Sequence, residues 1–227
     1  MRRLLLFTLL VLAFSCNNER ILLLPEIVNA EITEVHDVSP IYVFYDETKA
    51  DSLELNRANL ITSTNWLVNI DKRLTLGQVI PKIIELQDKK RKAEAKKSEH
   101  TKNYFTCNDT SIQNLGFLDF TKVIYKTNFV LPNISPDYEN PREKRIIIDF
   151  RSPRDIKLVS IFKDSVIVKS SLPNLTADIE ALAKDVSYEL YLNINDNLSF
   201  QDYITFKSTL SKVNFPKMSI NENEFIY

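Results

Sequence analysis

Residues 66–86 read WLVNIDKRLTLGQVIPKIIEL, and residues 190–210 read LYLNINDNLSFQDYITFKSTL. Aligned without a gap, at an offset of 124 residues, these two stretches share 5 identities over 21 positions. Each begins with apolar residues at strand spacing, continues through a polar turn and ends in a helical pattern. The identities fall on expected core positions, namely Asn69 and Asn193, Ile70 and Ile194, Leu74 and Leu198, Ile80 and Ile204, and Leu86 and Leu210.

The repeated unit also carries matching helix-start signals. Thr75 with Gln78, and Ser199 with Asp202, occupy equivalent positions and are typical of capped helix N-termini. Pro81 lies beyond the first turn, where it removes a backbone donor and predicts a kink. The repeat favours two related domains of about 90 residues each. The alternative is that any strand, turn and helix unit shows such a pattern.

Working outward from the repeat, the remaining apolar runs complete an α+β fold. In the first half they predict strands at residues 41–45, 53–55 and 117–125. In the second half they predict strands at 145–150, 157–162, 165–168 and 218–220, and a helix through Ile179 and Ala183 capped by Asn174 or Thr176. Residues 127–142 contain Pro132, Pro136 and Pro141 and predict a linker. We therefore expect domains at 39–126 and 143–227, each a mixed β-sheet with helices packed on one face, and we expect the second to fold alone.

The N-terminus resembles a bacterial export signal. Arg2 and Arg3 precede an uncharged apolar run over residues 4–14, which is too short to span a bilayer comfortably. The run ends in Ala13-Phe14-Ser15-Cys16, which resembles a lipobox whose cysteine becomes acylated. We expect residues 1–16 to be a signal with lipidation at Cys16, followed by a tether over residues 17–38. An ordinary cleaved signal and an uncleaved anchor are the alternatives.

Composition excludes several function classes. The chain of 227 residues has 29 basic and 30 acidic side chains, so it has no overall charge that would favour nucleic acid. It has only 2 glycines, Gly77 and Gly116, so neither a P-loop nor a dinucleotide-binding fingerprint can be written. We expect no cofactor and no nucleic-acid partner.

Candidate catalytic and metal-binding residues are few. His36 beside Asp37 could orient a base, but a solvated loop pair is the simpler interpretation. Cys107 could be a reactive thiol, although a half-buried structural cysteine is more common. The chain has 2 histidines and 2 cysteines, and one of the cysteines lies in the signal, so we expect no zinc site. The carboxylates at expected strand ends, Asp149, Asp155 and Asp164, are typical turn residues. We therefore predict no catalytic residues and no enzyme.

A highly charged stretch occupies residues 88–103 and contains the run Lys89-Lys90-Arg91-Lys92. Such a run is usually a solvated helix extension or an exposed loop. The functional alternative is contact with an anionic polymer or a lipid surface.

The second half, from about Ser165 onward, resembles the periplasmic domain of the ExbD/TolR family of biopolymer-transport proteins. The resemblance rests on the element order and on residues 190–204, LYLNINDNLSFQDYI, which are similar to the family's last strand, turn and helix. Leu23-Leu24-Pro25 is similar to the segment that follows the family's membrane helix. The first half resembles the same domain, except that residues 60–64 are too short for its first helix and residues 89–103 are an insertion.

The resemblance implies a non-enzymatic protein of the cell envelope. Family members carry an ionisable aspartate in a membrane helix, where it couples to proton flow, whereas residues 4–15 contain no acidic residue. We therefore expect a membrane-anchored lipoprotein facing the periplasm that binds envelope proteins or peptidoglycan, with a homodimer as a possible assembly. A structural envelope lipoprotein with no transport role is the first alternative, and an unrecognised hydrolase is the second.

Overall fold

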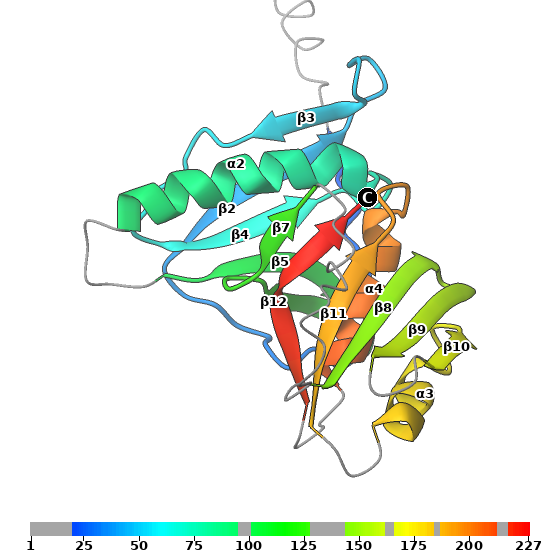
Figure 1. The fold of residues 1–227 in the computed structure, drawn as a ribbon. Coiled ribbons are helices and arrows are strands. Elements are labelled where there is room, and N and C mark those ends of the chain that lie inside the picture. Colours follow the sequence, from blue (N-terminus) through cyan, green and yellow to red (C-terminus); the bar gives the residue numbers. More distant parts are fainter. Residues whose placement is uncertain (1–19, 95–100, 128–143, 162–165, 184–186, 213–217) are drawn as a thin grey trace, which may run out of the picture.

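The computed structural model describes residues 20–94, 101–127, 144–161, 166–183, 187–212 and 218–227. These residues form an α+β fold with two mixed six-stranded sheets and three helices (Figure 1). The predicted signal, most of the predicted linker, Cys16 and Asp164 lie outside the described residues.

The first sheet has the strand order β1-β5-β4-β2-β3, and β6, which is not on this path, pairs antiparallel with β5. The chain forms a β2–β3 hairpin, then β4 parallel to β2, helix α2, and β5 parallel to β4. The elements are β1 (Glu26–Ile27), β2 (Val38–Tyr45), β3 (Leu53–Asn56), β4 (Asn65–Ile70), α2 (Leu76–Glu94), β5 (Asn103–Asp109) and β6 (Asn114–Asp119).

The second sheet has the order β10-β9-β8-β11-β12-β7. Its chain path repeats that of the first sheet: the β8–β9 hairpin, β11 parallel to β8, helix α4, and β12 parallel to β11. The elements are β7 (Ile124–Lys126), β8 (Lys144–Ser152), β9 (Asp155–Ile161), β10 (Val166–Ser170), α3 (Leu175–Leu182), β11 (Tyr188–Ile194), α4 (Phe200–Ser211) and β12 (Met218–Ile226). Strand β10 and helix α3 are additions between the hairpin and β11.

The two repeated segments meet at their turns. Thr75 forms an isolated antiparallel bridge with its equivalent, Ser199. Around this bridge the hydrogen bonds are reciprocal at the offset of the sequence repeat. Leu76 N–H donates to Leu198 O at 3.0 Å, and its equivalent, Phe200 N–H, donates to Leu74 O at 2.7 Å. In the same way Gly77 N–H donates to Asp196 O at 2.8 Å, and Gln201 N–H donates to Lys72 O at 3.3 Å. Such reciprocity is the signature of a two-fold relation. The chain therefore contains a local two-fold axis between its halves.

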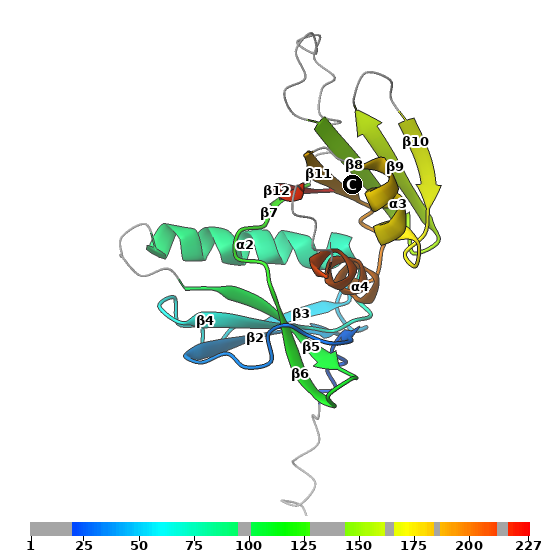
Figure 2. The ribbon, with the colours of Figure 1, turned by 90° about the horizontal axis from the view of Figure 1, so that it is seen from below.

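Helices α2 and α4 lie between the two sheets (Figure 2). Both helix caps are formed as predicted: Ser199 accepts from Asp202 N–H at 3.1 Å, and Thr75 and Gln78 form a reciprocal capping box. Buried side chains from both sheets and from the helices form one continuous cluster. The ring of Phe105 on β5, for example, packs edge to face against the rings of Phe200 and Tyr203 on α4, with distances between ring centres of 5.2 and 6.2 Å.

Strand β7 changes the predicted arrangement. Residues 117–125 were expected to form one strand closing the first sheet, but β6 ends at Asp119 and β7 pairs with β12 of the second sheet. The boundary between the sheets thus falls between β6 and β7, before the proline-rich segment. Strand β5 was not predicted, because its apolar residues are few and Thr106 separates Tyr104 and Phe105 from Cys107.

Residues 20–37, here called the N-terminal segment, are bound to the first sheet rather than forming a tether. Lys72 N–H donates to Leu23 O, Asn108 N–H to Pro25 O and Phe117 N–H to Ile32 O. The carboxylate of Asp109 accepts from the N–H groups of Asn29 and Ala30 at 3.2 and 2.6 Å. Sequence polarity predicted a solvated tether, but these backbone groups are satisfied by sheet pairing instead.

Candidate functional site

The predicted candidate His36-Asp37 lies at the surface. The His36 side chain is 79% exposed, and its Nε2 lies 3.5 Å from a carboxylate oxygen of Glu34. Asp37 has a positive φ of 50° at the turn before β2. The arrangement is that of a solvated loop, and it brings no described nucleophile to the imidazole.

Cys107 is completely buried on β5. Burial raises the pKa of its thiol to about 12, with a smaller contribution from the nearby charge of Asp109. The thiol therefore stays protonated at neutral pH, and it is more deeply buried than the half-buried position expected from sequence. Its role is to pack the first sheet.

Asp149 lies within β8, opposite Lys157 of β9, and Asp155 is the first residue of β9 after the hairpin turn. Asp149 accepts from Arg151 at 2.9 Å and from the Tyr227 hydroxyl, and burial with the Asp149 hydrogen bond raises the pKa of Tyr227 to about 12. Asp155 is exposed, and its N–H donates to Ser152 Oγ at 3.1 Å. Asp155 therefore lies at the strand end expected from sequence, whereas Asp149 lies inside β8 and its carboxylate binds Arg151 and Tyr227 instead of forming a turn.

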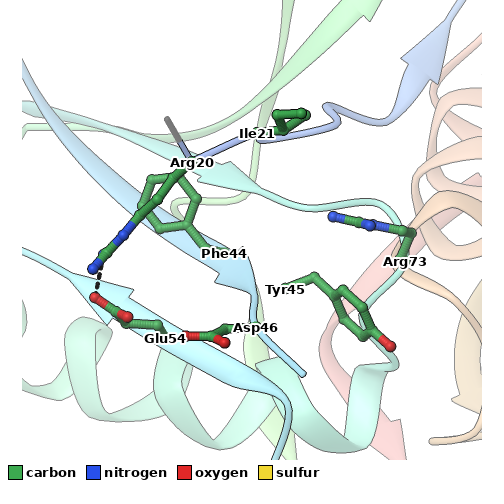
Figure 3. Close-up of a pocket in the computed structure, with 7 residues that line it drawn as sticks. All are labelled: Arg20, Ile21, Phe44, Tyr45, Asp46, Glu54 and Arg73. Atoms are coloured by element: carbon green, nitrogen blue, oxygen red, sulfur yellow. Dashed lines mark hydrogen bonds and ion pairs between the residues drawn. The ribbon is translucent and has the colours of Figure 1, made fainter. Parts of the chain in front are cut away.

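A pocket of about 330 Å³ opens beside the first described residues (Figure 3). Three elements supply its walls: the N-terminal segment, the β2–β3 hairpin and the turn after β4. The lining residues are Arg20, Ile21, Phe44, Tyr45, Asp46, Glu54 and Arg73. Sequence analysis did not single out any of them, because they come together only when the N-terminal segment is bound.

The two arginines of the pocket are engaged by neighbours. Arg20 pairs with Glu54, and its guanidinium lies 5.8 Å from the centre of the Phe44 ring. Arg73 lies 4.5 Å from the Tyr45 ring centre and forms two hydrogen bonds with Asp71, at 2.9 and 2.8 Å. Burial alone would raise the pKa of Asp71. Hydrogen bonds from Arg73 and from Leu23 N–H have the larger combined effect, so the pKa of Asp71 is lower than its usual value. The pocket is a mixed-charge aromatic site that suits polar or interfacial contacts. Its lining contains one phenol, that of Tyr45, and no thiol, serine or threonine hydroxyl, or imidazole.

The β10 edge is a second exposed feature. Among the described residues β10 pairs with β9 alone, so its other side has free backbone groups. The side chains of Val166 and Ile167 on this strand are 47% and 65% exposed. In register with Ile167, and on the same face of the sheet, Val159, Ile147 and Tyr191 continue an apolar row across three further strands. Val159 and Tyr191 are partly exposed, and Ile147 is buried.

A series of buried, hydrogen-bonded side chains connects the two halves but is not accessible to a ligand. Tyr125 of β7 and Tyr203 of α4 share a hydrogen bond of 2.9 Å, and Tyr203 donates to Glu224 of β12 at 2.8 Å. Lys207 completes the chain with an ion pair to Glu224 at 2.5 Å. Burial and the charge of Glu224 raise the pKa of both tyrosines well above the usual value. Both hydroxyls therefore remain protonated and serve as donors within the core.

Within the described part of the chain, no group of three or more His, Cys, Asp or Glu side chains could hold a metal ion. In the same part, no helix has the length and apolar character needed to cross a membrane.

Comparison with protein-family models, with curated proteins and with solved structures found no match for this chain.

Proposed function

We propose that this chain is a non-enzymatic binding protein of the bacterial cell envelope, anchored by a lipid on Cys16 and built from two ExbD/TolR-like units. The observation that carries the binding proposal is the β10 edge. An edge strand that exposes apolar side chains is a template for an added strand, and natural proteins usually block such edges with charges or prolines. The edge strand of the first sheet, β3, has the charged residue Glu54 on its outer face, whereas β10 exposes Val166 and Ile167 and has one exposed charge, Lys169, on the same face as Ile167.

The partner is an extended segment of another envelope protein that adds to β10. Main-chain hydrogen bonds along the edge supply affinity, and the exposed side chains of Val166 and Ile167 on β10 contact neighbouring side chains of the added strand. This mode favours a protein partner over peptidoglycan glycan, which has no backbone amides in β-strand spacing. A second copy of the chain adding at the same edge would form a homodimer.

Site-specific photocrosslinking in cells tests the proposal. A benzophenone amino acid at position 167 should crosslink to a defined envelope protein, and identification of the adduct names the partner. Position 112 is the matched control, because Ile112 is also an exposed isoleucine, at 48% against 65% for Ile167, but lies in the β5–β6 turn of the first sheet. Equal adducts from both positions would contradict edge-specific binding.

The alternative is a structural lipoprotein with no transport role. Under this alternative, position 167 gives no protein adduct and the chain co-sediments with isolated peptidoglycan. The anchor is tested separately by metabolic labelling with an alkynyl fatty acid, which should mark the wild type and miss Cys16→Ser.

A further inference from the structure

We infer that the outer face of the first sheet lies on the bilayer surface, with Ile21 and Leu23 in the interfacial region, while the second sheet points away from the membrane. This inference rests on the proposed acylation of Cys16. It goes beyond the proposed function because it assigns a membrane-facing surface and thereby the direction in which β10 is presented.

The first step is the side of the sheet on which the ordered chain begins. Val43 is fully buried toward α2, so its neighbour Phe44 points to the opposite, outer face, where it pairs with Glu54 across the hairpin. Arg20 contacts both Phe44 and Glu54. The N-terminal segment therefore starts on the face of the first sheet that is turned away from the helices (Figures 2 and 3).

The second step is the reach of the chain between the lipid and this face. Cys16 and Arg20 are four residues apart, and four extended residues span at most about 14 Å. A compact chain of this length has a radius of gyration of about 17 Å. The link is shorter than that radius, so the body cannot lift away from the membrane or turn its opposite side toward it. With residues 17–38 as a tether, by contrast, the reach would have been about 75 Å and would have set no orientation.

The third step is the chemistry of the surface that this link brings to the bilayer. Ile21, next to the first described residue, is 71% exposed, and Leu23, whose backbone is bound to the turn after β4, is 39% exposed. On the same outer face, Tyr42 is 37% exposed and stacks on Phe44 with ring centres 5.9 Å apart. Aliphatic and aromatic side chains next to a lipid anchor add apolar area to membrane binding.

The charges on this face do not specify a lipid type. Arg20 and Arg73 are each paired with a carboxylate, Glu54 and Asp71. The acidic residues Asp46 and Glu47 also flank the pocket. We therefore assign the occupant as the bilayer interface itself, with attachment driven by the acyl chain and the apolar side chains.

The test uses the full-length acylated chain in vesicles of phosphatidylethanolamine and phosphatidylglycerol. Ile21→Cys and Ile167→Cys are labelled with the fluorophore NBD, and lipids with a spin label near the headgroup act as quenchers. These two positions are matched, because both are exposed isoleucines, one in the N-terminal segment and one on the second sheet. The wild type is the labelling control, since Cys107 is completely buried and an acylated Cys16 has no free thiol.

We expect the quencher to reduce emission by about twofold or more at position 21 and to leave emission at position 167 nearly unchanged. Position 167 should instead be quenched by aqueous iodide. Equal lipid quenching at both positions, or weaker quenching at 21 than at 167, would overturn the orientation. Labelling of the wild type at Cys16 would show that this cysteine is not acylated, and would contradict the proposed anchor. Without such labelling, the quenching result tests the orientation alone.

Discussion

At the scale of single residues, Gly116 of β6 sets how closely the N-terminal segment approaches the first sheet. A Cβ atom at this position would lie 2.5 Å from Ala30 Cβ and 2.9 Å from Ile27 Cδ1. Carbon atoms in proteins do not approach that closely without displacement of one partner. Only glycine fits here, so one of the two glycines of the chain is explained by packing.

Gly116→Ala is therefore expected to lower the free energy of unfolding by about 1–3 kcal/mol, as overpacked positions do. Urea denaturation measures this change. Because the N-terminal segment is the displaced partner, proteolysis near residues 28–32 should also become faster. Gly77→Ala is the control, since a Cβ there is 3.4 Å from its nearest neighbour, Asp196, and needs no displacement. Equal effects at both glycines would contradict the close approach at Gly116.

Tyr203 is the central residue of the hydrogen-bonded side chains that connect the two halves, and Tyr203→Phe removes its hydroxyl. Tyr125 and Glu224 would each lose a hydrogen-bonding partner in a site without water access. The expected cost is about 1–3 kcal/mol in the free energy of unfolding, measured by urea denaturation. Tyr42→Phe, at an exposed tyrosine, should cost far less. A neutral Tyr203→Phe would mean that the hydroxyl chain contributes nothing to stability.

At the scale of elements, the N-terminal segment depends on the carboxylate of Asp109. Hydrogen bonds from Ala30 N–H, then from the Ser111 side chain and from the N–H groups of Ser111 and Asn29, lower the pKa of Asp109 from 3.8 to about 2. A lowered pKa in the folded state means that the ionised form stabilises the fold. This contribution is complete above about pH 4 and is lost as the pH falls through about 2.

The N-terminal segment should therefore loosen on acidification between about pH 4 and pH 2, before or together with global unfolding. The amide resonances of Asn29 and Ala30 report this in an NMR titration. Asp109→Asn removes the titrating group, so its segment should be loose at neutral pH and show no such acid transition. An acid transition of the same size in Asp109→Asn would assign the pH dependence to another carboxyl group.

The elements also show what the sequence could predict. Periodicity identified β2, β4, β8, β9, β11 and α4 because each carries its apolar residues at a regular spacing, and the caps at Thr75 and Ser199 are local signals. Strand β7 and the bound N-terminal segment were missed because their partners are distant in sequence. Three residues at Ile124–Lys126 have no periodicity of their own. The pocket and the β10 edge were missed for the same reason, since exposure depends on which neighbours the fold supplies.

At the scale of the whole molecule, the local two-fold axis makes the chain resemble a dimer of its own halves. The repeated turns form the contact, α2 and α4 fill the space between the sheets, and β7 from the first half completes the second sheet. The proline content of residues 127–142 favours two independent domains, whereas the continuous core favours one cooperative unit. A fragment covering residues 143–227 would lack β7 and would expose the faces of Phe200 and Tyr203 that contact Phe105.

We therefore predict that the two halves unfold together and that Phe105→Ala destabilises both. Phe105 belongs to the first sheet but packs on α4, and truncating a buried phenylalanine costs about 3–5 kcal/mol. Trp66, the single tryptophan, reports the first sheet by fluorescence during urea denaturation. Native-state hydrogen exchange of the β11 amides reports the second sheet. In the wild type both probes should give the same free energy of unfolding, and Phe105→Ala should lower both values equally.

Phe44→Ala, on the outer face of the first sheet, is the control and should lower the free energy of unfolding much less. If Phe105→Ala lowered only the value reported by Trp66, the halves would be separate domains that touch without sharing a core.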